Sequence, residues 1–351
     1  MTCDAQTALA RGSGKDAIVI VPPSLFAERS ALTTDPLMPR VPDNFLDAVV
    51  FLYPRREEAE QHAKAGGTAF MVGCPIEIDD VETPFYVPYM VTCRHVAWGS
   101  PVIRMNRRDG NPPDIVDLEI DDWIAHPDGY DVAATCMLGK IDHAIHSIKY
   151  LRLDKIFSRE HARYWRIGIG DEVVMIGRLV NYQGRRDNEA SVRFGRISKP
   201  PRPIYNAGIT KDQESWAVEM QSRTGFSGSP VATWRNIFTI LDDDLLADVA
   251  RRQFFGLLGI NWGYIKDEDG ENTWLNGVVP SWQILETLEV PALANKRKEA
   301  IEAVKNANGK QPNEVAELAV AVPPASDANP KHREDFNSLL NAAVRKPERE
   351  D

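Results

Sequence analysis

The residue in this sequence whose surroundings best suit nucleophilic chemistry is a serine flanked by glycines. Ser227 lies in Gly225-Phe226-Ser227-Gly228-Ser229-Pro230, between two segments patterned like β-strands. Such glycines allow a tight turn that aims the backbone N–H groups of Gly225 and Ser227 at one point, as an oxyanion hole requires. Because Gly-x-Ser-Gly also occurs in ordinary turns, the interpretation depends on partner residues.

Two partners for this serine precede it in the chain. Near pH 7 a serine hydroxyl needs an imidazole to take its proton and a carboxylate to hold that imidazole's tautomer. His95 follows an apolar run that ends in Val91-Thr92-Cys93-Arg94, and Asp131 opens the run Asp131-Val132-Ala133-Ala134. Alone, each is more often an ordinary structural residue. Together, in the order His, Asp, Ser, they predict a catalytic triad of His95, Asp131 and Ser227.

Two neighbouring residues compete for these roles. Ser229 shares the motif with Ser227, but the flanking glycines favour Ser227. Asp128 lies three residues before Asp131, in the turn Pro127-Asp128-Gly129, and should face solvent. We therefore expect Ser227 and Asp131 to be the functional residues.

The segments that must position these residues are short. From Phe45 to about Val279, β-branched or aromatic runs alternate with clusters of Gly, Pro, Asp and Asn. The predicted strands are Ala48–Tyr53, Gly67–Gly73, Val87–Thr92, Val102–Met105, Asp131–Leu138, Glu172–Ile176, Ser191–Ile197, Ala217–Met220, Val231–Trp234, Phe254–Asn261 and Trp274–Val279. About a dozen short strands are typical of barrels or a sandwich.

Helical patterns follow the strands. Ser281 is expected to cap a short helix whose Trp282, Leu285 and Leu288 form one face that can pack on a barrel. After Pro291 the composition shifts to Ala, Lys, Glu, Asn and Pro, which predicts a weakly helical tail.

An amphipathic helix is predicted inside this tail, over residues 330–345. Asn329-Pro330 supplies a cap and a first-turn proline, and apolar residues follow at helical spacing. They are Phe336, Leu339, Leu340, Ala343 and Val344. This stripe should dock on the body of the protein or bind a partner protein, although a frayed terminus is the alternative.

Charge and hydropathy disfavour two classes of partner. The formal net charge of −10 argues against general binding of nucleic acid, so the basic residues around Arg104 and Arg185 are expected to be solvated surface. No window approaches the roughly 18 apolar residues of a membrane helix. The first residues lack a basic segment followed by an apolar run, so they do not read as a secretory signal.

The four cysteines, Cys3, Cys74, Cys93 and Cys136, are widely spaced and contain no CxxC pair. This spacing disfavours zinc and favours free thiols in a reducing cytoplasm, although a Cys74–Cys93 bridge between adjacent predicted strands stays open. His143 and His146 share a helical spacing but have no third ligand nearby. We expect no metal and no cofactor.

Several motifs resemble those of the trypsin-like serine peptidases, especially bacterial members related to the high-temperature-requirement proteases. Thr92-Cys93-Arg94-His95-Val96 resembles their Thr-x-x-His-Val motif, and His126-Pro127 followed by Asp131-Val132-Ala133 resembles their His-Pro…Asp-Leu-Ala segment. Gly66–Gly73, Gly170–Gly177 and Gly195–Ser198 resemble strands of the two barrels. The resemblance spans about residues 45–290.

The resemblance implies an all-β fold of two antiparallel six-stranded β-barrels, chymotrypsin-like, over residues 42–290. Residues 1–41 would form an N-terminal extension and residues 291–351 a polar, partly helical or disordered tail. It implies a serine endopeptidase that cleaves protein or peptide substrates through an acyl-enzyme, with His95 as general base and then general acid.

Substrate contacts are also implied by the resemblance. Gly259-Ile260-Asn261-Trp262-Gly263 is similar to the strand that pairs with substrate backbone, so Asn261, Trp262 and Gly263 are expected to bind substrate. Gln221 corresponds to the floor of the primary specificity pocket and carries no charge, which favours cleavage after an uncharged residue. Phe226 stands where the digestive enzymes have an aspartate, so trypsin-style zymogen activation is not expected.

Two other functions are compatible with this sequence. A protease fold without activity can serve as a binding or scaffold protein, but such proteins usually lose a member of the triad. An esterase can use the same triad, because the triad does not select amides over esters.

Overall fold

The computed structural model describes residues 41–61, 66–76, 85–178, 188–221, 225–235, 254–267, 269–307 and 320–321. The chain divides into Met1–Arg40 and Val41–Asp351, and every described residue belongs to the second unit. The predicted N-terminal extension over residues 1–41, apart from Val41, and the predicted helix over 330–345 therefore lie outside the described residues.

Within the described residues the first sheet has nine strands, most of them antiparallel. Its path is β5-β4-β1-β2-β3-β7-β6, with β15 paired to β3 and β8 running parallel to β2. The strands are β1 (Val49–Tyr53), β2 (Gly67–Ile76), β3 (Phe85–Thr92), β4 (Val102–Met105), β5 (Asp114–Asp117), β6 (Ile124–Ala125), β7 (Ala133–Cys136), β8 (Leu151–Arg152) and β15 (Val320–Ala321). All five residues of β1 are buried, so both faces of this strand are covered and its sequence is continuously apolar.

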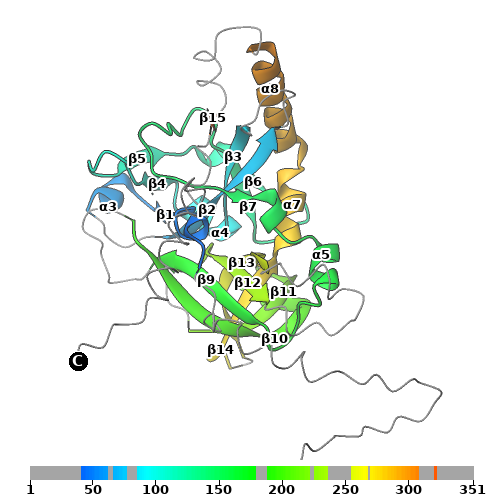
Figure 1. Cartoon of the computed structure of the whole chain (residues 1–351). Coiled ribbons are helices and arrows are strands. Elements are labelled where there is room, and N and C mark those ends of the chain that lie inside the picture. The colour runs from blue at the N-terminus through cyan, green and yellow to red at the C-terminus, as the bar shows by residue number, and fades with distance from the viewer. Residues whose placement is uncertain are drawn as a thin grey trace, which may run out of the picture. The chain divides into compact units, whose positions relative to one another are not determined.

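The second sheet has six antiparallel strands whose pairings close on themselves. They are β9 (Glu172–Arg178), β10 (Ala190–Asn206), β11 (Lys211–Glu219), β12 (Pro230–Arg235), β13 (Phe254–Lys266) and β14 (Asn272–Pro280). The order is β10-β11-β14-β13-β12-β9, and β9 pairs again with β10. Figure 1 shows these green and yellow strands gathered beside the blue and cyan strands of the first sheet.

The predicted mostly-β architecture with two antiparallel sheets is confirmed, and all eleven predicted strands are present. The prediction of six strands in each barrel is wrong for the first sheet, which has nine. The additional strands are short or edge segments such as β5 and β8, whose sequences do not alternate clearly between apolar and polar residues.

Short helices connect or cover the sheets, and two C-terminal helices run along one side (Figure 1). They are α2 (Asp43–Leu46), α3 (Arg56–Glu60), α4 (Arg94–Gly99), α5 (Arg159–Tyr164), α7 (Ser281–Leu288) and α8 (Pro291–Ala307), with 3-10 turns at η2 (Ile120–Asp122) and η3 (Leu153–Lys155). In α8, Leu293 is buried and its carbonyl accepts a hydrogen bond from Tyr89 Oη at 3.0 Å. This part of the predicted tail is thus attached to the first sheet.

The predicted cap of α7 is wrong. The residue before the helix is Pro280, and the hydroxyl of Ser281 donates to the Phe157 carbonyl at 2.8 Å instead of bonding to the helix backbone. Of the predicted apolar face, Trp282 and Leu288 are buried and Leu285 is partly buried.

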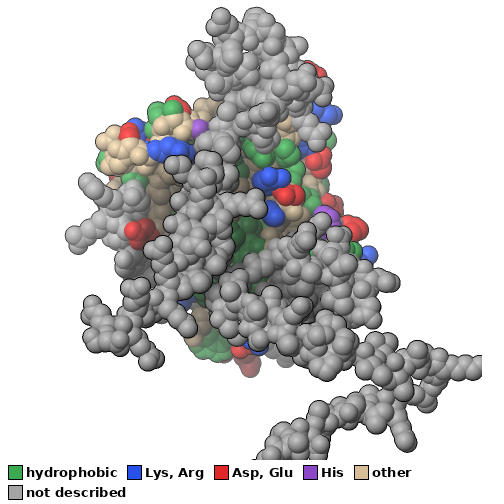
Figure 2. Space-filling model, viewed as in Figure 1, with side chains coloured by type: hydrophobic (Ala, Val, Ile, Leu, Met, Phe, Trp, Pro, Cys, Tyr) green, Lys and Arg blue, Asp and Glu red, His purple; other side chains and the backbone are tan. Residues whose placement is uncertain are grey.

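Cys74, Cys93 and Cys136 are free thiols, as expected for these three, and Cys93 is not bridged to Cys74. Arg104 is buried, so the prediction that it is solvated surface is wrong; its side chain reaches Asn188. On the face shown in Figure 2, basic and acidic side chains are interspersed. Within the described chain, no helix is both long and apolar enough to cross a membrane.

Candidate active site

His95 and Asp131 form a hydrogen-bonded pair between two adjacent strands of the first sheet. Thr92 at the end of β3 pairs with Ala133 at the start of β7. His95, which follows β3, and Asp131, which precedes β7, therefore lie side by side. Asp131 Oδ2 lies 2.7 Å from His95 Nδ1, and Asp131 Oδ1 accepts from the His95 backbone N–H at 3.1 Å. With the proton on Nδ1, the Nε2 of a neutral imidazole is an acceptor.

Asp131 is ionised although it is fully buried. Burial opposes the charged form, but hydrogen bonds from the side chain and backbone of His95 and from Asn206 outweigh it. Together they hold the pKa of the carboxyl below its usual value. Asp128, the competing carboxylate, is exposed in its turn, where Gly129 has a φ of 74°.

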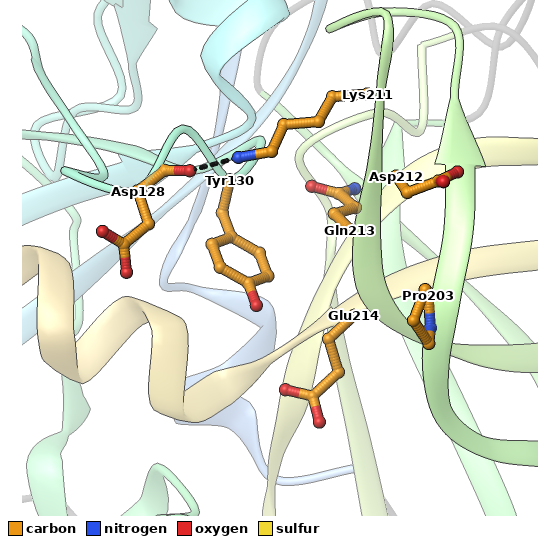
Figure 3. A pocket seen from close by; sticks show the side chains of 7 residues that line it. All are labelled: Asp128, Tyr130, Pro203, Lys211, Asp212, Gln213 and Glu214. Carbon is orange, nitrogen blue, oxygen red and sulfur yellow. Dashed lines mark hydrogen bonds between the residues drawn. The ribbon is translucent and has the colours of Figure 1, made fainter.

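A hairpin of the second sheet contacts the Asp131 loop. Asn206, the last residue of β10, donates from Nδ2 to Asp131 Oδ2 at 3.0 Å, and Gln213 of β11 accepts the Asp131 backbone N–H at 2.9 Å through Oε1. Lys211 Nζ donates to the Asp128 carbonyl, and Figure 3 shows Lys211 reaching across to that loop above Gln213. Nothing in the local sequence pattern marks these three residues.

The Ser227 turn is tightly fitted against β2. Gly225 and Gly228 have φ values of 97° and 85°, which only glycine adopts readily. A Cβ atom on Gly228 would lie 2.0 Å from the Thr68 carbonyl oxygen. Thr68 also donates from its backbone N–H to the Ser227 carbonyl and from Oγ1 to the Gly225 carbonyl, both at 2.8 Å. The turn therefore requires glycines and is anchored to the first sheet.

Of the two serines in the motif, Ser227 is partly exposed and Ser229 is fully buried. Ser227 Oγ donates to the Trp262 carbonyl at 3.3 Å. The backbone N–H groups of Gly225 and Ser227 donate to no residue in the described part of the chain. Phe226 between them is buried in the core of the second sheet.

A pocket of about 340 Å³ opens beside His95. It is lined by Arg94, His95, Trp98, Gly208, Ile209 and Thr210. The last three come from the β10–β11 hairpin, which therefore touches both the imidazole and its carboxylate.

The four predicted substrate-binding residues lie in different settings. Asn261 is buried, and its backbone N–H and carbonyl are bonded to Ser229 and Gly228, so it holds the serine turn and has no backbone group left for substrate. The Trp262 carbonyl faces Ser227, and Gly263 is partly exposed with a φ of 141°. Gln221 is exposed and lines a separate pocket of about 500 Å³.

Within the described residues, the single cluster with metal-ligand chemistry is Cys93, His95 and Asp131, whose ligand atoms lie within 4.8 Å of one another. The Cys93 thiol donates to the Asn261 carbonyl at 3.3 Å, and burial raises its pKa well above the ordinary value. All three groups are thus engaged with one another or with the protein. His143 and His146 bond to Tyr150 and Asp114 respectively.

No protein-family model matches this chain, and no curated protein matches it. Solved structures do match. The MamO protease domain from Magnetospirillum magneticum aligns with 70% of this chain and 98% of its own at 13% identity and a TM-score of 0.43. The active form of the Rv3671c protease from M. tuberculosis aligns with 80% of this chain and 93% of its own at 16% identity and a TM-score of 0.39.

The HtrA-type protease AlgW with a decapeptide aligns with 75% of this chain and 66% of its own at 15% identity and a TM-score of 0.36. All three alignments have TM-scores below 0.5 and identities below 20%. The function therefore has to be argued from the site itself.

Proposed function

We propose that this protein is a serine endopeptidase of double β-barrel architecture, with His95, Asp131 and Ser227 as its catalytic triad. The observation that carries the proposal is the His95–Asp131 pair, in which a buried, ionised carboxylate lies 2.7 Å from Nδ1 of a partly exposed imidazole. This arrangement fixes the tautomer in which Nε2 can take a proton. The accessible serine of a glycine turn lies on the opposite sheet.

In the proposed reaction His95 takes the Ser227 proton as Oγ attacks the scissile carbonyl, and then returns it to the leaving amine. Water repeats the sequence to release the acyl group. The N–H groups of Gly225 and Ser227 would stabilise the oxyanion, because the turn that holds them is rigidly anchored to Thr68. Attack requires the Ser227 hydroxyl to turn from the Trp262 carbonyl toward His95.

The proposed substrates are proteins or peptides. The Trp262 carbonyl beside Ser227 and the open backbone at Gly263 are the groups we propose for pairing with substrate backbone. Gln221 lines a pocket separate from that of His95, and its role in setting the preference for an uncharged side chain stays a prediction from the sequence. We leave Asn261 out of the proposed substrate contacts, because its backbone N–H and carbonyl are bonded to Ser229 and Gly228.

The test is labelling with a fluorophosphonate probe, followed by mapping of the modified residue. Ser227 should react and Ser227→Ala should not, because only a base-activated hydroxyl beside oxyanion donors reacts quickly. Ser229→Ala is the matched control and should keep the label, since Ser229 is buried. His95→Ala should slow turnover by several orders of magnitude. A label on Ser229, or near-normal turnover without His95, would disprove the assignment.

A catalytically silent binding protein is the second candidate. The Ser227 hydroxyl donates to Trp262, which is the observation that favours it. Failure of the folded protein to take the probe, together with binding of peptides, would support this candidate.

A further inference from the structure

The carboxylate of the proposed triad is held by a residue from the other sheet. We propose that Asn206 is a positioning residue, whose carboxamide fixes Asp131 in the orientation that His95 requires. This inference rests on the proposed peptidase function and adds to it a member that contacts neither substrate nor Ser227.

The orientation of the Asn206 carboxamide is determined by its two partners. The Gly208 backbone N–H, which can only donate, lies 2.8 Å from Oδ1. Oδ1 must therefore face Gly208, and the Nδ2 donor faces Asp131 Oδ2 at 3.0 Å. Both ends of the side chain are used, and Asn206 is only 1% exposed. The carboxamide consequently has one stable orientation.

The contact limits how the carboxylate can turn. Oδ2 receives both His95 Nδ1–H and Asn206 Nδ2–H, while Oδ1 receives the His95 backbone N–H. Without Asn206, Oδ2 would keep one donor in a site closed to water, and the carboxylate could rotate about its Cβ–Cγ bond. Rotation would disturb the imidazole orientation on which proton transfer depends.

A second contact from the same hairpin holds the main chain of the aspartate. Gln213 is 3% exposed, and its Oε1 accepts the Asp131 backbone N–H at 2.9 Å. The hairpin therefore binds Asp131 at its backbone and at its side chain. Asn206 presents a donor to the Asp131 carboxylate, and Gln213 presents an acceptor to the Asp131 backbone N–H. Side chains that only filled space would not need this match of donor and acceptor.

The pH dependence of activity distinguishes loss of the Asn206 hydrogen bond from loss of packing alone, because only the hydrogen bond affects the protonation of Asp131. Removing the Asn206 donor removes one of the bonds that keep the pKa of the Asp131 carboxyl low, so that pKa should rise. The other titratable group in contact is Cys93, which stays neutral because burial raises its pKa. The acidic limb of the kcat/KM profile should therefore move to higher pH.

The experiment compares Asn206→Ala and the isosteric Asn206→Asp with wild type and with Tyr205→Ala. Tyr205 is the adjacent hairpin residue and is exposed, so its variant should behave like wild type. We expect Asn206→Ala to lower kcat by about 10-fold to 100-fold with little change in KM. Asn206→Asp should lose more, since it replaces the donor by a second carboxylate. Thermal unfolding checks that each variant is folded.

Proton NMR of the His95 Nδ1–H···Asp131 bond measures the same effect without activity. Its low-field resonance should shift or broaden in both Asn206 variants and stay unchanged in Tyr205→Ala. A folded Asn206 variant with wild-type kcat, pH profile and resonance would overturn the proposal. If Asn206→Ala does not fold, the same measurements of kcat, pH profile and resonance on Asn206→Asp test the proposal. If wild type neither cleaves peptides nor takes the probe, the peptidase function fails, and the NMR comparison still decides the role of Asn206.

Discussion

The backbone N–H of Thr68 donates to the carbonyl of Ser227 at 2.8 Å. This bond ties the second strand of the first sheet to the serine turn of the second sheet. Thr92, three residues before His95, donates from Oγ1 to the Thr68 carbonyl in turn. The position of the proposed nucleophile relative to the proposed base is therefore set by hydrogen bonds through Thr68.

Gly228→Ala should displace this turn. The new methyl group would lie 2.0 Å from the Thr68 carbonyl oxygen, at a φ of 85° that disfavours L side chains. We expect a loss of about 2–4 kcal/mol in the free energy of unfolding and slower reaction with the probe. Denaturant unfolding and the rate of labelling measure the two effects.

Gly270→Ala is the matched control, because Gly270 has a φ of 82° but a Cβ atom there would meet no neighbouring atom within 4 Å. It should cost only about 1–2 kcal/mol, from the backbone conformation alone, and leave labelling unchanged. Equal losses in the two variants would contradict the collision with Thr68.

His143 should make the protein less stable in mild acid. Burial lowers its pKa to about 4 from an ordinary value of 6.5, so between these pH values the unfolded chain binds a proton that the folded chain excludes. Stability should be unaffected by this group above about pH 6.5 and should fall as the pH drops toward 4. We expect His143 to account for about 1–2 kcal/mol of the decrease in unfolding free energy, after allowance for solvent screening. This contribution should be absent in His143→Asn.

The measurement for His143 is the unfolding free energy in urea from pH 7 to pH 4. His161→Asn, at an exposed histidine, is the control and should keep the wild-type slope. A His143→Asn slope identical to wild type would show that other groups cause the acid sensitivity.

Removal of the N-terminal segment should not be needed for activity. Phe226 is buried next to Ser227 and has no carboxylate that a newly formed α-amino group could neutralise. A chain that starts near Val41 should therefore react with the probe at a rate similar to that of the full chain. A large increase on trimming alone would argue for activation by cleavage.

Much of the fold follows from local sequence patterns. Each of the eleven predicted strands is an apolar or alternating run of about 4–8 residues, and such runs identify a strand without information from elsewhere in the chain. The pair of His95 and Asp131 was predictable for a similar reason, because each residue adjoins a clear strand.

The parts that were missed depend on contacts between distant segments. Asn206 lies 75 residues from Asp131 in sequence, and an asparagine at a strand end usually indicates only a turn. Ser281 looks like a helix cap, but its hydroxyl donates a hydrogen bond to the nearby Phe157 carbonyl instead. Asn261 was assigned to substrate because the pattern does not show that Ser229 and Gly228 already use its backbone.

Asn206 of β10 and Gln213 of β11, which hold Asp131, are translated well after Asp131 itself. A nascent chain that has emerged as far as residue 200 contains His95 and Asp131 but neither Asn206 nor Ser227. The ring that carries both later residues closes only when β14, which ends at Pro280, has been translated. The proposed catalytic residues can therefore come together only after most of the chain has been translated.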